Sequence, residues 1–215
     1  MTAEDTTLGG RAPQQARSRE TRAKLLAVTE DLLIEVGADA ITMGAVAARA
    51  EVAVGTVYRR FESRELLLRA VKDRMLTRLG DRLIARLRDP LADLESVINA
   101  YTQAVVDWMA ESGRLLPEVF GVGLHPVPQE RAEGLAALRR QLIEAATPHR
   151  GAVRLRDADA ELAFIGRTIT ASAMHRALSV EAAPDGMTWE QWRIRTALMA
   201  VAYLTTDRSL ALDTL

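Results

Sequence analysis

The chain has 215 residues, of which 48% are hydrophobic and 27% charged, a profile typical of a globular protein with a sizeable core. It has no cysteine, and its three histidines are isolated, which excludes disulfides and thiolate zinc sites and argues against a metal centre. The polar, acidic first fifteen residues do not form a signal peptide, and no apolar run reaches the roughly 20 residues that a bilayer span needs. We therefore expect a cytoplasmic protein without a cofactor.

The charge is distributed unevenly along the chain. Residues 11–78 hold 13 Arg or Lys against nine Asp or Glu, and this net charge of +4 leaves −5 for the remainder, since the total is −1. A basic N-terminal module on an acidic body indicates that a polyanion binds at one end of the molecule.

The N-terminal part predicts three helices after a leader. Residues 1–16 are polar with two glycines and a proline, which favours a disordered leader. A helix is then expected over 18–36, and Gly37 suits the positive φ that ends a helix. Thr42 offers its hydroxyl to cap a second helix at 43–50. A three-residue turn leads to a third helix at 54–61.

The remainder of the chain also has helical periodicity. Ser63 can cap a long fourth helix over 64–88, which Asp89 and Pro90 end. Five further helices are expected, over 91–111, 115–120, 129–146, 157–181 and 188–206. The predicted fold class is therefore all-α, with about nine helices. Residues 17–63 form a helix-turn-helix domain in this prediction, and 64–215 a larger helical bundle for ligand binding and dimerisation.

Two short helices joined by a three-residue turn, with a supporting helix before them, are typical of a helix-turn-helix. The second of the two helices enters the major groove of DNA in that motif. The amino-acid sequence of residues 17–71 resembles the DNA-binding domain of the TetR family. The matching residues are Gly37, Ile41-Thr42, Val46-Ala47, Val52, Val54-Gly55-Thr56-Val57-Tyr58-Arg59-Arg60-Phe61 and Ser63-Arg64-Glu65-Leu66-Leu67.

The resemblance, with the chemistry of the side chains, predicts a DNA-binding set. Gly55 lets the backbone approach DNA closely, whereas hydroxyls, methyls and guanidinium groups contact phosphates or base edges. Val57 and Phe61 are expected in the core. Taken singly, each polar residue is more often part of a solvated face. The full set is Arg17, Thr42, Arg49, Val54, Gly55, Thr56, Tyr58, Arg59, Arg60 and Arg64, with Arg19 and Arg22 as further candidates.

Three residues depart from the family pattern. Glu51 stands where the family usually has a turn glycine, so a left-handed conformation there would cost roughly 1–2 kcal/mol. Ala53 stands where a Ser or Thr commonly caps the third helix. Gly44 replaces a polar base-contacting residue of some members. These departures can weaken DNA binding.

The resemblance also implies a homodimer that pairs its last two helices with their copies, and an effector site inside the bundle. A small, moderately apolar effector is expected, because ligand sites are mostly apolar with a few polar groups. The alternative for each residue is ordinary core, interface or loop. The candidate ligand contacts are Tyr101, Trp108, Met109, Phe120, His125, Phe164, Thr168 and His175.

The sequence therefore favours a repressor that binds a palindromic operator in double-stranded DNA, is released by an effector, and is not an enzyme. A helical binding or catalytic bundle with a vestigial DNA head is an alternative, although no nucleophile motif, acidic metal pair or phosphate loop supports it. Regulation by a protein partner without a small ligand, and activation in place of repression, are further alternatives.

Overall fold

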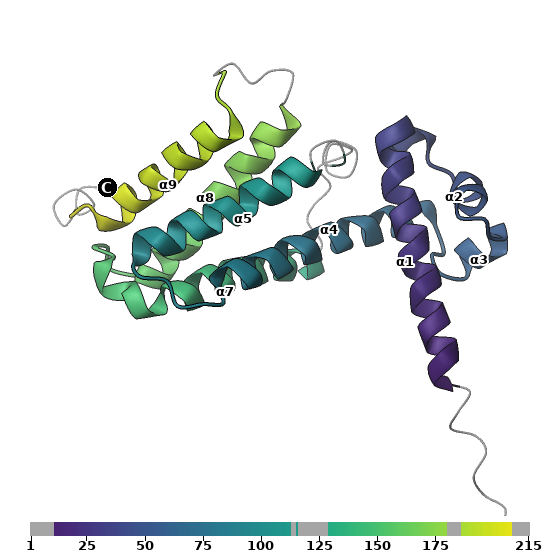
Figure 1. Cartoon of the computed structure of the whole chain (residues 1–215), viewed down its shortest axis with the longest axis horizontal. Coiled ribbons are helices and arrows are strands. Elements are labelled where there is room, and N and C mark those ends of the chain that lie inside the picture. The colour runs from purple at the N-terminus through teal and green to yellow at the C-terminus, as the bar shows by residue number, and fades with distance from the viewer. Residues whose placement is uncertain (1–10, 113–114, 116–128, 180–185, 208–215) are drawn as a thin grey trace, which may run out of the picture. The chain divides into compact units, whose positions relative to one another are not determined.

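The computed structural model describes residues 11–112, 115, 129–179 and 186–207 (Figure 1). The described residues form helices and the segments that connect them, without a strand, so the predicted all-α class is confirmed. None of the helices described is long and apolar enough to cross a membrane. The chain divides into two compact units between Asp73 and Arg74, ten residues later than the predicted boundary and inside a helix.

The N-terminal unit is built on a long first helix. It contains α1 (Arg11–Val36), the 3-10 turn η1 (Ala38–Ala40), α2 (Met43–Arg49), α3 (Val54–Tyr58) and the first part of α4 (Arg64–Leu87). Its core is a set of apolar side chains at 0–1% exposure. They include Leu25, Leu33, Ile41, Val46, Val57 and Leu67.

Helix α1 begins seven residues before the predicted start, so residues 11–16, expected in the leader, are helical. The reason is local. Pro13 lies in the first turn, where its missing N–H has no helical partner to lose, and Ala and Gln around it are good helix formers. Residues 1–10 of the expected leader lie outside the described residues.

Three of the residues predicted to end or cap helices in this unit are confirmed in that role. Gly37 has φ 79° and ψ 165°, a conformation that essentially only glycine adopts. The Thr42 hydroxyl accepts from the backbone N–H of Ala45 at 3.0 Å and so caps α2. The Ser63 hydroxyl accepts from Leu66 N–H at 3.3 Å at the start of α4. These short-range bonds fix where the helices begin and end.

The C-terminal unit is a bundle around α5 (Leu94–Ser112). Besides the rest of α4 it contains α7 (Gln129–Ala146), the 3-10 helix η2 (Thr147–Ala152), α8 (Ala158–Leu178) and α9 (Trp189–Thr205). Helix α5 packs against α7, α8 and α9, as Figure 1 shows. It starts at Leu94, three residues later than predicted, because Asp93 caps it by accepting from Ser96 N–H at 2.7 Å. The predicted sixth helix at 115–120 lies almost wholly outside the described residues.

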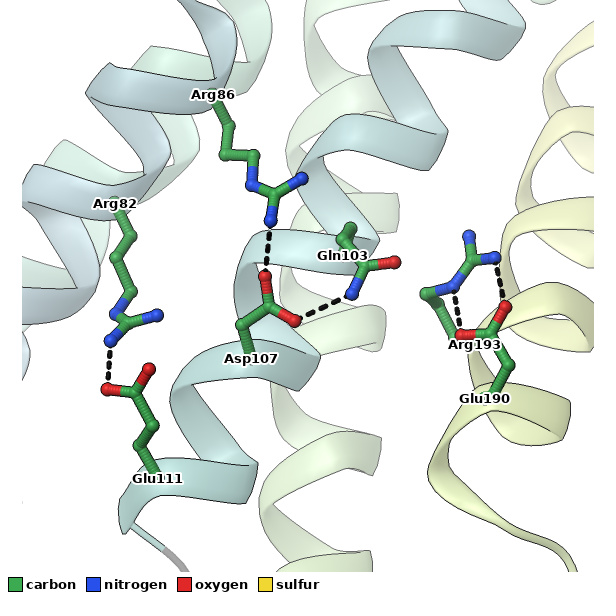
Figure 2. A network of polar contacts seen from close by, with 7 residues as sticks. All are labelled: Arg82, Arg86, Gln103, Asp107, Glu111, Glu190 and Arg193. Atoms are coloured by element: carbon green, nitrogen blue, oxygen red, sulfur yellow. Dashed lines mark hydrogen bonds and ion pairs between the residues drawn. The ribbon is translucent and has the colours of Figure 1, made fainter.

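Polar contacts join α4 to α5 within this unit. The buried Trp108 indole donates to the Met75 carbonyl at 3.0 Å. Two ion pairs, Arg82 with Glu111 and Arg86 with Asp107, lie nearer the surface (Figure 2). Asp107 also accepts from the Gln103 amide at 2.6 Å. Helix α4 is therefore held on α5 by one buried hydrogen bond and a partly exposed ion-pair layer.

Candidate functional site

Helix α3 presents one side to solvent and anchors the other in the core. Val57 is completely buried and Phe61, which follows the helix, is 5% exposed. Val54 and Tyr58, four residues apart, are 44% and 51% exposed. Gly55, Arg59 and Arg60 are exposed beside them. The helix ends at Tyr58, three residues before the predicted end at Phe61. The predicted contact residues of α3 thus share a surface, and the predicted core residues hold it.

Gly55 is not required by packing. A Cβ built on Gly55 meets nothing within 4 Å, and glycine in a helix costs roughly 1 kcal/mol relative to alanine. Within the described part of the chain nothing explains this glycine, whereas close approach of another molecule to the α3 backbone would.

Several candidate side chains already have partners within the unit. Arg59 donates to the Thr56 hydroxyl at 3.1 Å, which links the two residues on α3. Arg49 forms a 2.6 Å ion pair with Glu35 of α1, with both side chains about half exposed. Contact between Arg49 and a phosphate would have to compete with this pair, which is weak because water screens it.

Arg64 makes bonds that sequence reasoning missed. Its guanidinium donates to the Ile41 carbonyl at 2.9 Å and also to the Ala38 carbonyl. These carbonyls belong to η1 and to the residue that follows it, and the Ala38 carbonyl also accepts from the Ile41 N–H at 3.2 Å. Arg64 is half-buried and ties the start of α4 to η1, while its contact with phosphate stays a prediction.

The three departures from the family pattern have visible structural effects. Glu51 adopts a φ of 56°, the left-handed conformation expected at this turn position. Ala53 precedes α3 without a side-chain capping bond. Gly44 is exposed on α2. The turn between α2 and α3 is therefore formed, but without the residues that would stabilise it most.

Among the candidate ligand contacts, three lie in the interior of the bundle. Tyr101, Trp108 and Met109 are at most 2% exposed. The Tyr101 hydroxyl lies 3.1 Å from the Thr170 hydroxyl and 3.3 Å from the Gly166 carbonyl. Burial raises the pKa of Tyr101, so the hydroxyl stays protonated. The bundle therefore contains a neutral polar pair formed by the buried Tyr101 and the half-buried Thr170.

The structure does not bring the other candidates to this interior. Phe164 is 45% exposed, Thr168 is half-buried and donates to the Phe164 carbonyl, and His175 is exposed. Phe120 and His125 lie outside the described residues. Helix α8 turns a different row inward, made of Leu162, Ile165, Gly166, Ile169, Ala173 and Ala177.

The outward side of α8 continues onto α9 as an apolar surface. The Phe164 ring lies 5.6 Å from the Tyr203 ring, centroid to centroid, and the Tyr203 hydroxyl donates to Glu161 at 2.7 Å. The large apolar side chains exposed on the two helices, which we name the α8/α9 surface, are Phe164, Leu178, Ile194, Leu198 and Met199.

No cluster of three or more His, Asp or Glu side chains with metal-binding geometry occurs among the described residues.

Residues 25–71 match the family model described as bacterial regulatory proteins of the tetR family. The HTH-type transcriptional repressor KstR of Rhodococcus jostii (strain RHA1) is 35% identical over 100 residues. These are 46% of this chain and 47% of the repressor, so the match spans about half the length of that curated relative.

Solved structures share the fold over most of the chain. A TetR-family transcriptional regulator from Pectobacterium atrosepticum is 24% identical with a TM-score of 0.62, covering 88% of this chain and 92% of that one. The transcriptional regulator FadR from Bacillus subtilis, solved in complex with stearoyl-CoA, has a TM-score of 0.67 at 14% identity, covering 84% of this chain and 98% of that one. The α2–α3 geometry agrees with the family match, which identifies residues 25–71 as a DNA-binding domain of the type found in bacterial regulatory proteins of the tetR family.

Proposed function

We propose that this protein is a cytoplasmic transcriptional repressor that binds a palindromic operator as a homodimer and is released by a small apolar effector. The observation that carries the proposal is the outward row of α3, where Val54, Gly55 and Tyr58 are exposed while Val57 is buried. A short helix anchored in this way can enter the major groove with its exposed side against base edges and phosphates.

The α8/α9 surface supports the dimer. Leu198 is 68% exposed and Met199 53%, and contiguous exposed apolar surface on a protein marks an interaction site. Two copies related by a two-fold axis would cover it with the same surface of the partner. The two DNA-binding units would then address two half-sites.

The first experiment is selection of bound sequences from random duplexes with the full-length protein. We expect an enriched pseudo-palindrome whose half-sites are separated by about one helical turn or a multiple of it. Light scattering of the complex should give two protomers for each such site. Failure to enrich any sequence, with folded protein, would contradict the proposal.

Gly55→Ala tests whether α3 is the reading helix. Because a Cβ at Gly55 meets nothing, the variant should be at least as stable, by up to about 1 kcal/mol, yet bind the selected operator at least tenfold more weakly. Gly151→Ala is the matched control, since a Cβ there also meets nothing and Gly151 lies in η2 of the other unit. Undiminished operator binding by Gly55→Ala would exclude close contact at α3.

Thermodynamic linkage between effector binding and operator binding tests the proposed release by an effector. The interior polar pair of Tyr101 and Thr170 supports a ligand with an apolar body and a polar group, and acyl thioesters belong in the compound panel because the Bacillus subtilis relative was solved with one. A compound that releases operator must itself bind more weakly to the operator complex, by the same factor. Equal affinity with and without operator would show that the compound is not the releasing effector.

A further inference from the structure

The positive charge of the N-terminal unit is not located on its helix-turn-helix. Residues 25–73, which contain the buried core, have six Arg or Lys against eight Asp or Glu, a net charge of −2. Residues 11–24 have five basic residues against one acidic residue, a net charge of +4. DNA affinity depends strongly on the number of phosphates that a protein neutralises. The compact part of the unit is poorly suited to supply that attraction by itself.

The basic segment is a helix that extends beyond the core. The first buried residue of α1 is Leu25, whereas the described side chains of residues 15–24 are exposed or half-exposed. In Figure 1 the N-terminal turns of α1 extend past α2 and α3. Arg17, Arg19 and Lys24 form no ion pair within the described part of the chain. Their charges are thus exposed and not neutralised by a carboxylate there.

One contact fixes where this segment leaves the core. The Arg22 guanidinium lies 5.5 Å from the centroid of the Phe61 ring, and Phe61 lies three residues after the end of α3. Arg22 lies three and four residues before Leu25 and Leu26, so it continues the core-facing stripe of α1. The basic segment therefore starts next to the end of the helix proposed to read DNA.

We propose that residues 15–24, the basic arm, bind the phosphate backbone of the duplex that flanks each half-site read by α3. This inference rests on the proposed function and adds a second DNA contact outside the helix-turn-helix. The ten residues of the arm span about 15 Å at 1.5 Å per residue, the length of about four base pairs. Phosphates are the matching partner, since the arm presents cations without carboxylate partners and most protein–DNA hydrogen bonds go to phosphate and sugar oxygens.

The test is a triple variant, Arg17→Gln, Arg19→Gln and Lys24→Gln, compared with wild type on the selected operator. Glutamine keeps helix propensity, and circular dichroism checks that the fold is retained. Each lost phosphate contact lowers the slope of log K against log salt by about 0.9, so the slope should fall by about two to three per subunit. The matched control removes three exposed arginines of the other unit, Arg88, Arg140 and Arg154, and its slope should stay within half a unit of wild type.

Shortening the duplex tests whether the basic arm contacts the DNA that flanks the operator. Removing about four base pairs from each side of the operator should weaken binding by wild type at least tenfold and leave binding by the arm variant almost unchanged. An arm variant with wild-type salt slope, or equal sensitivity of both proteins to trimming, would overturn the inference. In either case, retained enrichment of the palindrome by wild type would leave the proposed function intact, so the two failures are distinguishable.

Discussion

Glu51 adopts a φ of 56° in the turn between α2 and α3, a region that costs a non-glycine residue roughly 1–2 kcal/mol. Replacing Glu51 with glycine should therefore raise the free energy of unfolding by about 1 kcal/mol, measured by urea denaturation. The substitution also removes a carboxylate next to the proposed DNA surface, so operator affinity should rise.

Glu62→Gly is the control for both effects. Glu62 is also exposed and has an ordinary negative φ, since Glu51 is the one non-glycine residue with positive φ in the described ranges. Removing the charge of Glu62 should bring no gain in stability. A stability gain of the same size in both variants would show that charge, not backbone strain, is responsible.

Substitution of Arg64 is expected to lower the free energy of unfolding, because this side chain bonds to the backbone of its own unit. Without its guanidinium, the Ile41 and Ala38 carbonyls lose their side-chain donor. The Ala38 carbonyl keeps the Ile41 N–H as a donor, so the main loss is at the carbonyl of the buried Ile41, and an unsatisfied buried polar group costs about 1–3 kcal/mol. Arg64→Ala should lower the urea midpoint, and Arg64→Lys should recover only part of the loss because one ammonium does not reproduce the planar fork. Unchanged stability with a salt slope lower by about one would instead support phosphate contact.

The residues that the sequence predicts well are those whose partners are close along the chain. The Thr42 and Ser63 caps span three residues each, and residue type and position suffice to predict them. The bonds of Arg64 span 23 and 26 residues. A short-range pattern contains no information about such bonds, so only the fold could assign Arg64 its structural role.

At the scale of helices, the attachment of α4 to α5 should depend more on Trp108 than on the ion pairs. Trp108→Phe removes a buried hydrogen bond to Met75 and part of a buried ring, which should cost about 2 kcal/mol or more. Replacing both Arg82 and Arg86 with alanine should cost less than about 1 kcal/mol, because these pairs are partly exposed and exposed ion pairs contribute little. Urea denaturation at low and high salt measures both, and only the arginine effect should shrink with salt.

Helix α8 shows where periodicity stops being informative. Two rows of side chains on this helix have the spacing of a buried face. One contains Phe164, Thr168 and His175, and the other begins with Leu162 and Ile165. A helix that is apolar on two sides does not reveal which side meets its own bundle. The structure buries the second row, and the first lies on the outward side. The helix ranges themselves were predicted closely, as with α7 at 129–146, because prolines and glycines mark the breaks.

At the scale of the whole molecule, the α8/α9 surface should determine the oligomeric state. Leu198→Glu places a charge on the most exposed of its large apolar side chains, and burying that charge without a partner is costly. The variant should be monomeric at micromolar concentration by light scattering and bind a full operator far more weakly, since one DNA-binding unit then acts alone.

Ile34→Glu is the matched substitution outside this surface. Ile34 is 46% exposed on α1, so the same change in chemistry should leave the dimer intact. A dimeric Leu198→Glu variant would move the interface to another part of the molecule.

The exposed position of Lys24 on the basic arm has a practical consequence. The chain has two lysines and no cysteine, and Lys72 is buried to 9% exposure. An amine-reactive dye should therefore attach to a side chain almost entirely at Lys24, besides any free α-amino group. The native protein would thus carry a fluorescent reporter next to the surface where we place DNA, without an introduced residue. Operator duplex should shield this amine from acylation, and a footprint of Lys24 by mass spectrometry would show it.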